Sequence, residues 1–111
     1  MPTEPLDIDA MRTAATAATS LLKALANPER LLLLCQLTAG ERSVGELEAL
    51  LGIQQPTLSQ QLGVLRREGL VRTRREGKNI HYSIGDAAAL TLLQTLYDLY
   101  CNGKANKAAA P

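Results

Sequence analysis

The sequence has little of what several classes of protein depend on. Its 111 residues contain no Phe or Trp, two cysteines, Cys35 and Cys101, and one histidine, His81. Two Cys and one His are too few for a closed four-ligand zinc site within one chain. No apolar run approaches the roughly 20 residues that cross a membrane, so we expect no membrane partner.

The first nine residues lack basic side chains and contain three acidic ones. A secretory signal begins with a basic segment, so we expect no export and a cytoplasmic location, where thiols stay reduced. The chain length supports one domain, with a core of Leu, Val, Ile and Ala because large aromatics are missing. We place that domain at residues 9–102, between flexible tails over 1–8 and 103–111.

The net charge of +1 hides an uneven distribution. Residues 1–50 carry four basic and seven acidic side chains, whereas residues 51–85 carry six basic and two acidic ones. Residues 86–111 are balanced. Positive charge concentrated on one segment suits the neutralisation of nucleic-acid phosphates, although many charge runs are only solvated faces.

Periodicity and capping signals predict two helices in the first third of the chain. Apolar side chains recur at three- and four-residue steps over residues 9–25, which is the helical period. Asn27 and Pro28 are the residue types favoured at a helix start, and the Leu-rich run that follows them indicates a buried helix ending at Gly40.

The middle of the chain has the signals of a helix-turn-helix. Ser43 and Glu46 match a capping box that opens a short helix, which stops at Gly52. A second helix is predicted to begin at Pro56, with a core stripe of leucines, and to end at Gly69. In such a unit the second helix enters the DNA major groove.

A hairpin and a last helix complete the predicted order. Alternation over residues 70–84 surrounds a polar turn at Gly77, and Asp86 caps a final apolar helix. We therefore expect a mainly α fold with a small β-hairpin, a winged helix-turn-helix. The first and last helices carry more apolar surface than one small domain can bury, so we expect a homodimer formed through them.

Candidate DNA contacts follow from this arrangement. The outward side chains of the second helix are hydrogen-bonding types, and Gln can bond adenine through two atoms; they are Gln54, Gln55, Thr57, Ser59, Gln60 and Gln61. Arg74, Arg75 and Lys78 flank the hairpin tip, where a wing can follow the DNA backbone. The alternative is a polar, solvated face on an ordinary helical hairpin.

The motifs resemble those of the ArsR/SmtB family of bacterial winged-helix repressors. The resemblance is carried by residues 27–31, 43–47, 56–66 and 69–71, and it extends over roughly residues 17–102. It implies a homodimer that binds an inverted repeat of double-stranded DNA in a promoter and leaves it on an inducer signal.

Family metal sites use a Cys-x-Cys motif in the first helix of the helix-turn-helix, or Asp and His on the last helix. Residues 46–51 contain no Cys, and the helix after Asp86 contains no His. His81 falls in the hairpin, where a lone His is more often a strand residue or a phosphate contact. We therefore expect no metal and no other cofactor.

The two cysteines remain as candidates for the sensor. A free Cys is commonly just a small buried apolar residue, but Cys101 precedes a polar stretch near the helix end, where a thiol can react. Leu34-Cys35 and Tyr100-Cys101 are similar to the sulfide-responsive subgroup of the family. That resemblance implies that persulfide or polysulfide bridges the two sulfurs, by thiolate attack on a sulfane sulfur and resolution by the second thiol.

The sequence thus predicts a repressor released from its operator when Cys35 and Cys101 are joined by a disulfide or polysulfide. An enzyme is not expected, because there is no Cys-x-x-Cys motif and no glycine-rich substrate loop. The alternatives are a metal-responsive or general redox-responsive regulator of the same family, or a DNA-binding activator that displaces another repressor.

Overall fold

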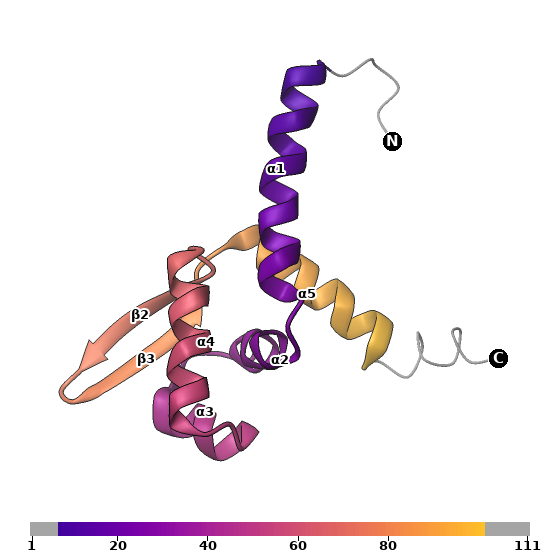
Figure 1. Ribbon diagram of the computed structural model, residues 1–111. Coiled ribbons are helices and arrows are strands. Elements are labelled where there is room, and N and C mark those ends of the chain that lie inside the picture. The colour runs from indigo at the N-terminus through magenta and orange to yellow at the C-terminus, as the bar shows by residue number, and fades with distance from the viewer. Residues whose placement is uncertain (1–6, 102–111) are drawn as a thin grey trace.

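The computed structural model describes residues 7–101, which form five helices and three strands (Figure 1). The elements are α1 (Ile8–Leu25), α2 (Pro28–Leu37), β1 (Arg42–Ser43), α3 (Val44–Leu51), α4 (Gln55–Arg67), β2 (Val71–Glu76), β3 (Asn79–Ile84) and α5 (Ala87–Tyr100). The predicted order of elements is confirmed. The predicted tail over 103–111, and most of that over 1–8, lies outside the described residues.

The predicted helix starts are made by side-chain caps. The Asn27 side chain accepts hydrogen bonds from the backbone N–H groups of Glu29 and Arg30, both at 3.0 Å. The capping box is complete, since Ser43 Oγ accepts from the Glu46 N–H at 3.2 Å and the Glu46 carboxylate accepts from the Ser43 N–H at 2.8 Å. These bonds satisfy N–H groups that a helix leaves without a backbone partner.

Two details differ from the prediction. Helix α4 begins at Gln55, one residue before Pro56, and its N-cap residue Gln54 makes no side-chain capping bond. Strand β1 was not predicted. Its two residues pair with β3, giving a three-stranded antiparallel sheet in the order β1-β3-β2. Two residues are too few to show a strand period in the sequence.

A leucine core joins α2, α3, α4 and α5. The side chains that are almost wholly buried are Leu33, Leu34, Leu47, Leu58, Leu62, Leu65 and Leu93. Tyr82 of β3 is the aromatic residue of this core. The expectation of an aliphatic core is confirmed, and so is the predicted stripe on α4.

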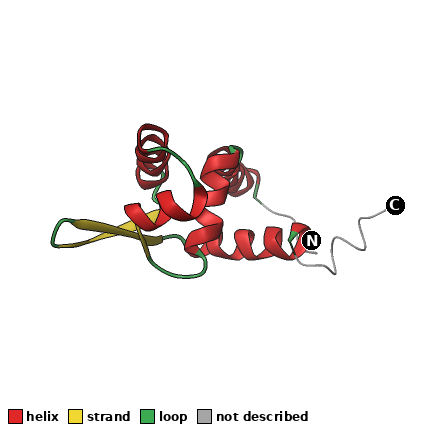
Figure 2. Ribbon diagram, turned by 90° about the horizontal axis from the view of Figure 1, so that it is seen from below, coloured by secondary structure: helices red, strands yellow, loops and turns green. Residues whose placement is uncertain are grey.

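The first helix and the hairpin extend away from this core. In Figure 1, α1 rises from the body, and only Ala24 and Leu25 at its end are buried. Figure 2 shows the hairpin projecting beyond the helices. Among residues 7–101, no helix has the length and apolar character to cross a membrane.

Candidate nucleic-acid interface and thiol pair

A three-residue turn, residues 52–54, joins helices α3 and α4. Gly52 has φ of +67°, a left-handed conformation that favours glycine, and it ends α3. Ile53 is buried in the core and so anchors the turn against it. The first turn of α4 contains no acidic residue, so the positive end of its helix dipole is not neutralised there.

The polar face predicted for α4 is largely formed. Gln54, Gln55, Ser59 and Gln60 are exposed and Thr57 is half-buried. The Ser59 hydroxyl donates to Gln55 Oε1 at 2.9 Å, so these two side chains hold one another on the exposed face. This face offers amide and hydroxyl groups to solvent, as a groove-binding helix does.

Gln61 lies apart from the other five residues predicted to contact DNA from this helix and its N-cap. It is half-buried, and its Oε1 accepts a hydrogen bond from Arg30 Nη1 at 3.0 Å. The sequence could have predicted that Gln61 lies near the core. It stands next to the core residue Leu62 and four positions before Leu65, so it falls on the same face as Leu65.

The wing carries its basic residues in two different states. Arg74 on β2 forms ion pairs with Glu41 at 2.7 Å and with Glu76 at 2.9 Å. Hydrogen bonding to Arg74 lowers the pKa of both carboxyl groups and raises the pKa of the guanidinium. Both ion pairs found within residues 7–101 involve Arg74. Arg75 and Lys78 are exposed and form no ion pair within those residues.

The two cysteines line one cavity of about 530 Å³ between α2, α3 and α5. Cys35 on α2 is half-buried, whereas Cys101, just after α5, is exposed. The lining is mostly apolar and includes Leu32, Leu93 and Tyr97. Burial, and secondarily the charge of the Cys101 thiolate, raises the pKa of the Cys35 thiol. The Cys35 thiol is therefore less ionised than an ordinary cysteine thiol.

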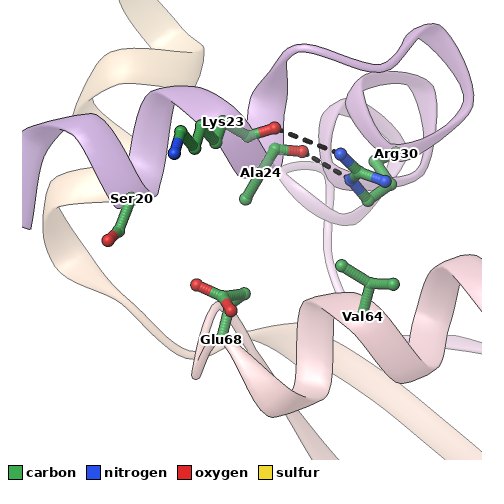
Figure 3. A pocket seen from close by; sticks show the side chains of 6 residues that line it. All are labelled: Ser20, Lys23, Ala24, Arg30, Val64 and Glu68. Carbon is green, nitrogen blue, oxygen red and sulfur yellow. Dashed lines mark hydrogen bonds between the residues drawn. The ribbon is translucent and has the colours of Figure 1, made fainter.

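A second cavity, of about 240 Å³, lies between α1, α2 and α4 and was not foreseen from the sequence. Figure 3 shows its lining, which is Ser20, Lys23, Ala24, Arg30, Val64 and Glu68.

In the part of the chain that the structure describes, no group of three His, Cys, Asp or Glu side chains could hold a metal ion.

The comparisons with known proteins agree with this architecture. Residues 27–73 match the model of the family described as bacterial regulatory protein, arsR family. The biofilm growth-associated repressor of Agrobacterium fabrum is 53% identical over 108 residues, which is 93% of this chain and 92% of that protein. The chain belongs to the ArsR family.

Solved structures of other ArsR-family and related regulators have the same fold. Reduced HlyU from Vibrio cholerae N16961 superposes with a TM-score of 0.82 at 41% identity, covering 85% of this chain and 99% of that one. A homodimeric winged helix-turn-helix DNA-binding domain from Mycobacterium bovis, a possible ArsR-family regulator, gives a TM-score of 0.74 at 29% identity over 94% of each chain.

These relatives confirm the predicted family and the winged helix-turn-helix fold. The ArsR-family chain is a DNA-binding transcriptional regulator, and the prediction that it is not an enzyme is confirmed by the same relatives.

Proposed function

We propose that this ArsR-family regulator is a repressor that leaves its operator when Cys35 and Cys101 are bridged on exposure to persulfide or other reactive sulfur. The observation that carries the proposal is the cavity that the two thiols share. They are far apart in the sequence, and α2 packs against α5 to bring them to one place. A single bridge there would join two helices.

The DNA-binding half of the proposal rests on the polar face of α4 and on the wing. The amides and hydroxyls of this face enter the major groove of an inverted repeat; they belong to the exposed Gln54, Gln55, Ser59 and Gln60 and to the half-buried Thr57. Arg75 and Lys78 neutralise phosphates beside it. Arg74 and Gln61, which were predicted to bind DNA, already bond within the chain, and we assign them supporting roles.

A homodimer is part of the proposal, because the end helices leave apolar side chains in solvent. Leu22 on α1 is 56% exposed, and Tyr97 and Tyr100 on α5 are 57% and 71% exposed. The related Mycobacterium bovis domain is described as homodimeric. Pairing α1 and α5 with a second copy would bury these side chains and set two recognition helices about one DNA turn apart, roughly 34 Å.

The proposed chemistry takes place in two displacement steps. One cysteine thiolate attacks the sulfane sulfur of a persulfide, RS–SH, forming a cysteine persulfide and releasing RS⁻. The thiolate of the other cysteine then attacks the inner sulfur of that persulfide, forming the Cys35–Cys101 disulfide and releasing HS⁻. The two thiols lose two electrons, and the sulfane sulfur is reduced to sulfide. Where both cysteines are persulfidated first, loss of one HS⁻ leaves a longer sulfur bridge.

The bridge acts on DNA binding through α5. It pins the end of α5 to α2, and α5 belongs to the proposed dimer interface, so the spacing of the two recognition helices changes. Couplings of this kind are typically about 1–3 kcal/mol, or about 5- to 150-fold in affinity. A coupling of that size is enough to release an operator.

The test is a DNA shift assay on the gene's own promoter with reduced, polysulfide-treated and peroxide-treated protein. Wild type should bind when reduced, lose affinity on polysulfide treatment and regain it with a thiol reductant. Cys35→Ser and Cys101→Ser should bind DNA like wild type and ignore polysulfide. Release of either single variant would contradict the bridge, and release by peroxide alone would favour a general redox sensor.

A further inference from the structure

Arg30 connects three helices through one guanidinium group (Figure 3 shows two of the bonds). Its Nε donates to the Ala24 carbonyl at 2.7 Å and its Nη2 donates to the Lys23 carbonyl at 3.1 Å, both in the last turn of α1. Its Nη1 donates to Gln61 Oε1 on α4 at 3.0 Å. Arg30 itself stands in the first turn of α2.

This arrangement uses properties that only arginine has. The last carbonyls of a helix lack intrahelical partners, and a cation placed there also offsets the negative end of the helix dipole. The planar guanidinium can satisfy two carbonyls with one edge and still direct a third N–H elsewhere. At this site the third N–H is directed at α4.

The space beside Arg30 is hollow. The second cavity separates α1 from α4 at this level, with Ser20 on one side and Val64 and Glu68 on the other. In residues 7–101, the Arg30 guanidinium is the side chain that links these two helices by hydrogen bonds. Because side chains do not fill this space, the polar link contributes to holding α1 and α4 at this level.

We infer that Arg30 is a positioning residue for DNA binding: it fixes the recognition helix α4 to the end of α1, and Gln61 serves as its partner and not as a DNA contact. The inference rests on the DNA-binding half of the proposed function and is independent of the cysteines. Because α1 belongs to the proposed dimer interface, this link sets how each recognition helix is held relative to the dimer.

Two matched glutamate variants distinguish the roles of neighbouring glutamines. Gln61→Glu keeps an acceptor facing Arg30, and should weaken operator binding by less than about threefold, since the new charge is paired. Gln60→Glu places the same charge on the exposed face of α4, toward the phosphates, and should weaken binding about tenfold or more. If the two variants lose affinity equally, or Gln61→Glu loses more, the inference is wrong.

The salt dependence of binding separates positioning from phosphate contact. Arg30→Met should weaken operator binding roughly tenfold with an unchanged slope of affinity against salt concentration. A slope reduced by about one would assign Arg30 to a phosphate instead. Arg30→Met combined with Gln61→Leu should cost little more than Arg30→Met alone, because Arg30→Met already removes the bond to Gln61. Additive losses would contradict the partnership.

A measurement without DNA tests the Arg30–Gln61 link by itself. In wild type, the Arg30 guanidinium N–H signals should exchange slowly with solvent by NMR, and Gln61→Leu should accelerate the exchange of Nη1 while leaving that of Nε slow. Fast exchange in wild type would overturn the link even if DNA binding is normal. Wild-type protein that binds no promoter fragment but keeps slow exchange would instead count against the proposed function.

Discussion

Leucine side chains of the buried core and leucine side chains on the outer faces of α1 and α5 differ in their exposure to solvent. Leu33 and Leu58 in the core are completely buried, whereas Leu22 on α1 is 56% exposed and Leu99 on α5 is 49% exposed. The solvent-facing leucines on these two helices form an apolar surface that no other part of the described chain covers. The core is thus complete within one chain, whereas the apolar faces of the end helices are those that the proposed second copy would bury.

The largest effect should come from the core itself. Leu58→Ala removes a wholly buried side chain in the first turn of α4 and should lower the free energy of unfolding by about 2–5 kcal/mol. Urea unfolding followed by circular dichroism measures this. Leu50→Ala on the adjacent helix α3, where the side chain is 54% exposed, is the control and should change the midpoint little. Equal losses in the two variants would remove the contrast between buried and exposed leucines.

The next largest effect should come from the end helices. Leu22→Glu places a charge on the exposed apolar face of α1, and should dissociate the proposed dimer at a cost of about 2 kcal/mol or more. Sedimentation velocity measures the oligomeric state. Leu50→Glu introduces the same charge at another exposed leucine, on α3, and should leave the dimer intact. A Leu22→Glu protein that stays dimeric would exclude this face of α1 from the interface.

Helix caps should show a smaller effect in the same direction. Asn27→Ala removes the acceptor of two N–H groups at the start of α2 and should cost about 1 kcal/mol of stability. Asp7→Ala removes one bond, at 3.2 Å, at the exposed start of α1, and should cost less. Thermal unfolding of both variants gives the comparison. A larger loss of stability for Asp7→Ala would indicate that the start of α1 also contacts a second chain.

The two thiols should differ in rate and in pH dependence. Burial raises the pKa of Cys35, so its thiolate fraction at neutral pH is below that of an ordinary cysteine. In Cys101→Ser, iodoacetamide should alkylate Cys35 several-fold more slowly than it alkylates Cys101 in Cys35→Ser. The Cys35 rate should keep rising into the alkaline range as the thiol ionises. A faster Cys35 would argue that Cys35, and not Cys101, supplies the first thiolate that attacks the persulfide.

Local signals in the sequence predicted most of the fold. The Asn27 cap and the Ser43–Glu46 box act within a few residues of one another, so their patterns are visible without the tertiary structure. Strand β1 was not predicted because it forms only by pairing with β3, which lies far from it in the sequence.

The candidate site was less predictable, because its side chains choose partners far along the chain. Arg74 was expected to face DNA, yet it pairs with Glu41, 33 positions away. Gln61 was assigned to the exposed face, yet it bonds Arg30, 31 positions away. Residue type indicates which groups can bind DNA, but packing decides which of them remain available.

Strand β1 has a consequence for how this regulator meets its target. Ser43 pairs with His81 of β3 and is also the N-cap of α3, so one residue belongs to both the sheet and the helix-turn-helix. The hairpin cannot swing away from the helices without breaking the pairing between β3 and β1. In the proposed DNA complex the wing and the recognition helix therefore approach the double helix as one unit, and little conformational entropy is lost in aligning one with the other.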